Sequence, residues 1–122
     1  MGFIEAFPIV PTPKPRMSQR DKWKSPPRPC VARYRAFCDE CRIRGVKLPD
    51  QGATITFFIP MPKSWSAKKR AEMDGKPHQQ KPDISNLLKA LEDAVCKDDS
   101  TIWHYAGQAK HWAKEGGIVI RT

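Results

Sequence analysis

The chain has 122 residues, of which 39% are hydrophobic, and its 22 Lys and Arg against 13 Asp and Glu give a net charge of +9. This length suffices for one domain with one core and is too short for two. No apolar run approaches the roughly 18 residues of a membrane span, and the first ten residues lack the pattern of a secretory signal. The charge favours a polyanionic partner, and nucleic acid above an anionic membrane surface, because no basic helix with a broad apolar face stands out.

Two features are expected before the first long helix. Residues 2–9 predict a short strand that Pro8 breaks. Residues 11–29, PTPKPRMSQRDKWKSPPRP, are rich in proline and in positive charge, which predicts an extended, partly ordered arm without a regular element. The arm's candidate nucleic-acid-binding residues are Lys14, Arg16, Arg20, Lys22 and Lys24.

Residues 30–44 predict a helix that ends at Gly45. Cys38 and Cys41 form a CxxC pair, but without a second ligand pair this is a weak zinc signal. Both cysteines also fall on one apolar stripe of the helix, so core packing is favoured over metal binding. Free thiols fit the reducing cytosol, which is the expected compartment.

The rest of the chain completes an α+β pattern. Residues 53–60, ATITFFIP, alternate as a strand, and residues 64–74 predict a short helix that Ser64 caps. Residues 83–96 predict a further helix. Residues 101–112 and 117–121 flank a Gly-Gly break and predict a terminal hairpin. The order β-α-β-α-α-β-β indicates one small α+β domain over residues 1–122, with a mixed, largely antiparallel sheet packed against helices.

The segment 81–103, KPDISNLLKALEDAVCKDDSTIW, gathers five of the acidic residues of this basic chain: Asp83, Glu92, Asp93, Asp98 and Asp99. At about 100° per residue, one face of its helix is apolar, and the opposite face carries polar side chains with Lys89 near the middle. Asp83 precedes the helix after a proline that keeps it out of helical geometry. The apolar face comprises Ile84, Leu87, Leu88, Leu91, Ala94 and Val95, and the polar face Ser85, Asn86, Lys89, Glu92, Asp93 and Cys96.

Two interpretations of this segment fit the residues equally well. Clustered carboxylates suit Mg²⁺ or Mn²⁺, which prefer hard oxygen ligands, and a lysine beside them can stabilise charge that builds on a phosphate. Alternatively, Asp83 is a helix cap, Glu92 and Asp93 form a solvated face with Lys89 as the i,i+3 partner of Glu92, and Asp98–Asp99 is a turn.

The motif resembles that of a known family. KPDISNLLKALEDAVCKDD is similar to the signature of RusA-family Holliday junction resolvases of phages and prophages: Asp-x-Asp-Asn-Leu-x-Lys entering a helix, a further Asp within it, then Asp-Asp before a strand. The segments PKPRMSQRDKW and RPCVARYRAFCDECR also resemble phage-type members. The resemblance covers most of residues 8–103, and its core motif specifies several polar positions together.

The resemblance implies a small α+β homodimer that binds four-way DNA junctions and nicks two strands symmetrically with Mg²⁺ or Mn²⁺, in the cytoplasm of a bacterial host. By position, Asp83, Lys89 and Asp99 match the catalytic residues. Asp83, Asp93, Asp98 and Asp99 match the acidic positions, with Asp99 the favoured metal ligand of the terminal pair. Asn86 matches the asparagine, an expected nucleic-acid contact.

One departure matters. Ser85 stands where the family has its second aspartate, and a neutral hydroxyl is a poor ligand. Glu92, two turns further on the same face, is the predicted compensating metal ligand. Other functions remain open: a non-catalytic relative that binds branched DNA, with a metal site weakened at Ser85, or a small basic RNA-binding protein.

Overall fold

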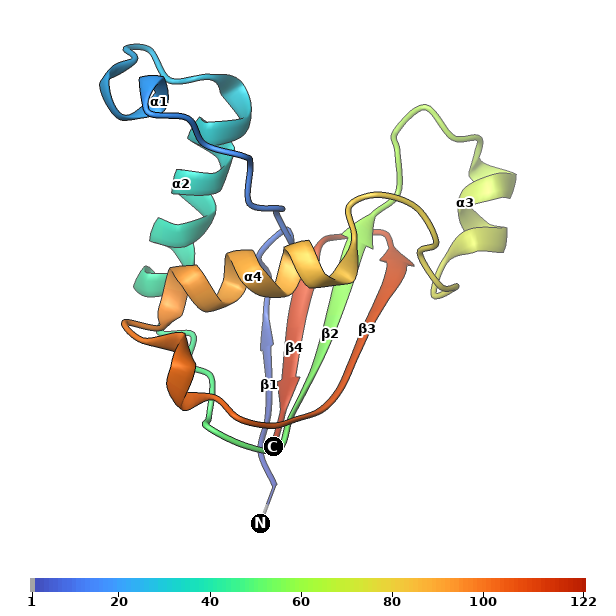
Figure 1. Ribbon diagram of the computed structural model, residues 1–122. Coiled ribbons are helices and arrows are strands. Elements are labelled where there is room, and N and C mark those ends of the chain that lie inside the picture. The colour runs from blue at the N-terminus through green and yellow to red at the C-terminus, as the bar shows by residue number, and fades with distance from the viewer. Residues whose placement is uncertain (1) are drawn as a thin grey trace.

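The computed structural model, which describes residues 2–122, consists of a four-stranded sheet with helices packed on one face (Figure 1). The strands are β1 (Ile4–Phe7), β2 (Ala53–Pro60), β3 (Tyr105–Ala113) and β4 (Gly117–Arg121). The helices are α1 (Arg20–Trp23), α2 (Pro29–Ile43), α3 (Ala67–Met73), α4 (Ile84–Val95) and the 3₁₀ turn η1 (Asp99–Thr101). The expected α+β class is confirmed, with α1 and η1 as additions to the predicted order. No helix in residues 2–122 is both long and apolar enough to cross a membrane.

The core lies between this sheet and the helices α2 and α4. Ile55 and Phe57 of β2 are fully buried, as the alternation predicts, and they belong to one cluster with Leu87 and Leu91 of α4. Burying a leucine side chain contributes about 1.5–3 kcal/mol. Packing of this apolar stripe therefore holds α4 in place and turns its polar face outward.

The cysteines of α2 contribute to the same core. Cys38 and Cys41 are buried beside Tyr34 and Phe37, which confirms the predicted packing role of the CxxC pair. Burial raises the pKa of Cys41 to about 12, because a thiolate is poorly solvated there. All four cysteines of the chain are free thiols.

The sheet order is β1-β4-β2-β3, so the predicted hairpin of the last two strands is wrong. β2 lies between them and pairs parallel with β3 and antiparallel with β4. Strands two positions apart are separated by about 9.6 Å. The four Cα steps from Ala113 to Gly117 can span about 14 Å, which is enough to cross over β2. The central, apolar β2 thereby gains a partner along both edges.

Two local predictions are also corrected. α3 begins at Ala67, and its cap is Ser66 instead of Ser64, since the Ser66 hydroxyl accepts a hydrogen bond from the Lys69 amide at 3.2 Å. The arm contains a regular element, the single turn α1, which forms in its proline-free stretch. The prolines restrict only the flanking parts of the arm.

Candidate active site

The polar face of α4 is exposed only in part, since Asn86, Glu92, Asp93 and Cys96 are half-buried. The helix has Asp83 at its N-cap position with extended backbone (φ −67°, ψ 148°), but the Asp83 side chain makes no capping hydrogen bond. Its carboxylate is exposed and forms no hydrogen bond or ion pair within residues 2–122. Ser85 and Lys89, one turn apart on the same face, are also exposed.

Asp99 lies beside Lys89. The turn η1 brings the chain back along α4, and the Asp99 carboxylate lies 3.8 Å from the Lys89 ammonium, with both side chains partly exposed. Lys89 therefore pairs with Asp99, and the alternative that Lys89 pairs with Glu92 is wrong. The family-matched lysine and the favoured acid of the terminal pair share one site.

The other three acids of the segment are each held by a donor. Asp93 accepts a hydrogen bond from the Lys14 ammonium at 2.6 Å, and Glu92 accepts one from the Tyr105 hydroxyl at 2.5 Å. Asp98 accepts from the amide and hydroxyl of Ser100, which holds the pKa of Asp98 below its usual value. The structure thus divides the five acids into two that accept no hydrogen bond, Asp83 and Asp99, and three that accept at least one; Asp99 is ion-paired with Lys89.

Lys110 of β3 holds the loop that carries Asp83. Its ammonium donates to the carbonyl oxygens of Gln80 at 2.5 Å and Pro82 at 2.7 Å, and the second of these belongs to the peptide bond that joins Asp83. No carboxylate in the described chain lies within ion-pair distance of this ammonium. Backbone pairing of Gly75 and His78 with β3 extends the same attachment.

A bulge in β3 brings Tyr105 and Lys110 onto one face of the sheet. The register with β2 shifts between Tyr105 and Gly107, so Tyr105 pairs with Ala53 and Lys110 pairs with Phe57. Because paired residues share a face, both side chains lie on the core side, toward α4. Without the bulge, their odd spacing in sequence would send them to opposite faces.

Tyr105 stays protonated at the end of this site. Burial raises its pKa, and the hydrogen bond to Glu92 raises it further. Cys96 is close by, and its pKa is also raised, first by burial and then by the negative charge of Glu92 and Asp99. Both shifts thus combine burial with the carboxylates that lie nearby.

A divalent cation fits the donor chemistry of Asp83 and Asp99. Within residues 2–122, no three side chains among His, Cys, Asp and Glu gather as a ready metal cage. Mg²⁺, however, is usually bound through one or two carboxylates together with waters and substrate phosphate. Two carboxylates that accept no hydrogen bond, Asp83 at the start of α4 and Asp99 beside Lys89, match that requirement, and Ser85 adds only a neutral oxygen.

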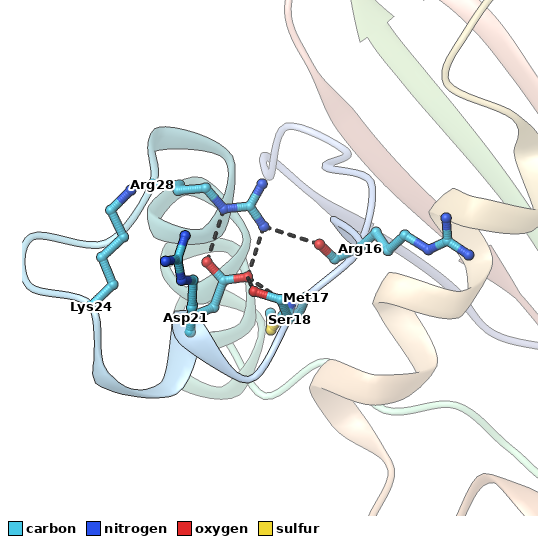
Figure 2. Close-up of a pocket in the computed structure, with 7 residues that line it drawn as sticks. Arg16, Met17, Ser18, Asp21, Lys24 and Arg28 are labelled. Atoms are coloured by element: carbon cyan, nitrogen blue, oxygen red, sulfur yellow. Dashed lines mark hydrogen bonds and ion pairs between the residues drawn. The ribbon is translucent and has the colours of Figure 1, made fainter.

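The basic arm is folded around a buried carboxylate (Figure 2). Asp21 is 3% exposed and accepts two hydrogen bonds from the Arg28 guanidinium, each at 2.8 Å, and one from the Ser18 amide, also at 2.8 Å. Arg28 donates in addition to the Arg16 carbonyl. The bonds to Arg28 first, and to Ser18 next, hold the pKa of Asp21 well below its usual range. The prediction of an arm without regular structure is corrected here, since one carboxylate organises it.

Most of the arm's cationic side chains take no part in this network. Figure 2 shows the side chain of Arg16 extending away from the Asp21–Arg28 pair and that of Lys24 lying beside Arg28; both residues line a hollow of about 520 Å³. Arg20 lines the same hollow, and Lys22 is exposed on α1. Lys14 differs from the others because its charge is matched by Asp93. That pair ties the arm to α4.

Sequence patterns missed three residues that shape the site: Asp21, Tyr105 and Lys110. Each acts through a partner distant in sequence or, for Asp21, through burial that a charged arm does not suggest. The β3 bulge has no local signal in the sequence. Asn86, predicted to contact nucleic acid, is half-buried on the α4 surface between Asp83 and Lys89 in sequence.

The fold and the site together define a small α+β domain in which a lysine of α4 and two carboxylates, at the start of α4 and on η1, lie on the surface beside a cationic arm. The family model for endodeoxyribonuclease RusA matches residues 6–122. The chain therefore belongs to the RusA family, whose members are endonucleases acting on Holliday junctions in DNA recombination. A comparison with curated proteins gave no match.

Proposed function

We propose that this protein is a metal-dependent endonuclease that resolves four-way DNA junctions by symmetric paired nicking. One observation carries the proposal: Lys89 lies 3.8 Å from the Asp99 carboxylate on the helix that Asp83 begins, and the Asp83 carboxylate is open. Family membership supplies the substrate class.

Asp83 and Asp99 are the residues that would hold Mg²⁺ or Mn²⁺. When bound, such a cation polarises a phosphoryl oxygen and makes water a better nucleophile. The Lys89 ammonium stabilises negative charge that builds on the phosphate as the bond to the leaving oxygen lengthens. Asp99 holds this ammonium on the exposed face until substrate binds. Glu92, with one oxygen free of the Tyr105 hydroxyl, adds the negative charge that Ser85 does not supply.

The arm positions the DNA backbone. Phosphates are bound by the arm residues Arg16, Arg20, Lys22 and Lys24. The Asp21–Arg28 pair holds the backbone that carries these side chains in one conformation, so little conformational entropy is lost on binding. Lys14 acts differently from this set, because it neutralises Asp93 on α4. This lowers the repulsion between that acid and an approaching phosphate.

Two symmetric cuts require two copies of the site in a constant relation, so the active species is a homodimer. The sheet face opposite α2 and α4 offers a surface for a second copy, with Thr56 and Val119 near its centre and Ile4 exposed at its edge. Light scattering should give twice the mass of the chain, and Thr56→Glu should give a monomer. A wild-type monomer, both free and bound to a junction, contradicts the dimer.

A four-way junction labelled on each strand tests the activity, with Mg²⁺, Mn²⁺ or a chelator present. Asp83→Asn and Asp99→Asn should abolish nicking and leave junction binding intact or tighter, since each removes a negative charge that faces the phosphates. Asp39→Asn, on the exposed side of α2, is the matched control. Nicking near the wild-type rate in either site variant contradicts the proposed site.

A second function is favoured by Ser85, which supplies a neutral hydroxyl where the family signature has an aspartate. A relative that binds branched DNA without cutting it would hold junctions tightly and show no metal-dependent nicking. Preference for RNA over four-way and linear DNA would instead indicate the RNA-binding alternative.

A further inference from the structure

The helix α3 projects from the domain without contributing to its core. None of its seven residues is buried, and Figure 1 shows it standing apart from the sheet, on the opposite side of α4 from the arm. A helix this short is not stable alone in water. It is attached through Trp65, whose ring packs on Trp112 at 4.8 Å, with Lys69 over the Trp65 ring at 4.2 Å.

The segment around α3, residues 63–76, is strongly cationic and is called the α3 lobe below. It carries five basic residues against Glu72 and Asp74. The five ion pairs within residues 2–122 all lie elsewhere, so none of these basic side chains is paired with a carboxylate, and the lobe keeps a net charge of +3. The basic residues are Lys63, Lys68, Lys69, Arg70 and Lys76.

The α3 lobe is continuous with the active site. A hollow of about 240 Å³ between α3 and the loop before α4 is lined by Lys69, Trp65 and Gln80. The carbonyl of Gln80 is one of the two oxygens that Lys110 holds, and Asp83 follows three residues later. The hollow thus lies between Lys69 and the loop that ends at Asp83.

The spacing of the two cationic projections suits duplex DNA. The arm is tied to the C-terminal half of α4 through Asp93, and the α3 lobe adjoins its N-terminal end. Twelve helical residues span about 18 Å. At about 3.4 Å per phosphate along one strand, that length covers roughly five phosphates. The arm and the α3 lobe can therefore bind one duplex on either side of the phosphate at Lys89.

We propose that the α3 lobe is a second phosphate-binding surface, which holds the duplex arm of the junction that leaves the site at Asp83. The proposal rests on the proposed function only in taking DNA as the ligand. It explains why a helix without buried residues is kept next to the active site. It also assigns a role to cations that no motif of the family signature includes.

The test is the triple variant Lys68→Gln, Lys69→Gln and Arg70→Gln, because glutamine keeps the helix propensity. Affinity for a four-way junction and for a linear duplex is measured without metal at several salt concentrations. The slope of log K against log salt should become shallower by up to about 2.7, and affinity near 0.15 M salt should fall at least about tenfold. Nicking at saturating protein should stay near the wild-type rate.

The matched control carries the same charge change at the other end of the sheet, with Arg44→Gln, Lys47→Gln and Arg121→Gln. Equal effects of the two triples would overturn the proposal, because net charge alone would then explain them. Should the α3 triple fail to fold, Lys63→Gln with Lys76→Gln, outside the helix, decides by the same slope.

The outcome is separable from that of the proposed function. If the protein never nicks DNA but the α3 triple selectively flattens the salt slope, the phosphate-binding role of the α3 lobe is supported and the proposed nuclease activity is contradicted. If the protein nicks junctions but the α3 triple leaves the salt slope unchanged, the nuclease activity is supported and the phosphate-binding role of the α3 lobe is contradicted.

Discussion

Replacing Lys110 by methionine tests whether the loop before α4 positions Asp83. Methionine keeps the apolar stem and removes the ammonium that donates at 2.5 Å to Gln80 and at 2.7 Å to Pro82. Hydrogen bonds from charged donors contribute about 1.5–3 kcal/mol each. Water can replace the donor at the exposed Gln80, so we expect a net loss of about 1–2 kcal/mol in the free energy of unfolding. In a domain of this size, that lowers Tm by roughly 4–8 °C.

The larger effect should appear in metal use. Removing a group that orients a metal ligand typically weakens metal affinity or activity about 10–100-fold. Lys110 acts through the backbone beside Asp83, so the Mg²⁺ concentration for half-maximal nicking should rise about tenfold. Excess Mg²⁺ should restore the rate, and Mn²⁺ binding measured by calorimetry without DNA should weaken by a similar factor.

Gln108→Met is the control, because Gln108 lies on the same face of β3 and is exposed. A lower Tm in Lys110→Met with unchanged Mn²⁺ affinity and Mg²⁺ dependence would refute the positioning role and leave Lys110 a purely structural residue. Loss of junction affinity with a shallower salt slope would make it an ordinary phosphate contact instead.

Three further predictions follow from the contacts described. Lys89→Ala should lower the nicking rate at saturating junction with little change in Kd; a changed Kd and salt slope alone would make Lys89 a backbone contact. Glu92→Gln keeps a hydrogen-bond acceptor and removes the charge, so metal-dependent nicking should fall, and adding Ser85→Asp should restore it; wild-type nicking in the single variant rules out compensation. Asp21→Asn should weaken junction binding several-fold by releasing Arg28, while net charge alone predicts tighter binding, so the sign of the change in a titration separates the two.

The helix α4 could be read from the sequence because its determinants are local. The 3.6-residue period of Leu87, Leu88 and Leu91 defined the buried face, and so placed Ser85 and Lys89 on the exposed one. The helix was predicted to within one residue at each end. β2 was predicted to the residue, since strict alternation has a single pattern of burial.

Contacts between distant segments were decided by the tertiary structure. The terminal strands looked like a hairpin, because a glycine-rich turn is a local signal, but both pair with β2 instead. The β3 bulge reverses the face of Tyr105 relative to Lys110, and no local periodicity records it.

The state of most of these acids was decided in the same way. The sequence grouped five carboxylates without ranking them. Asp98 has a local partner in Ser100, but Lys14 is 79 residues from Asp93. The Tyr105 hydroxyl of β3 donates a hydrogen bond to Glu92 of α4. Which carboxylates remain available to a metal therefore depends on which cations and hydroxyls the folded chain brings to them, and Asp83 and Asp99 are the two that accept no hydrogen bond.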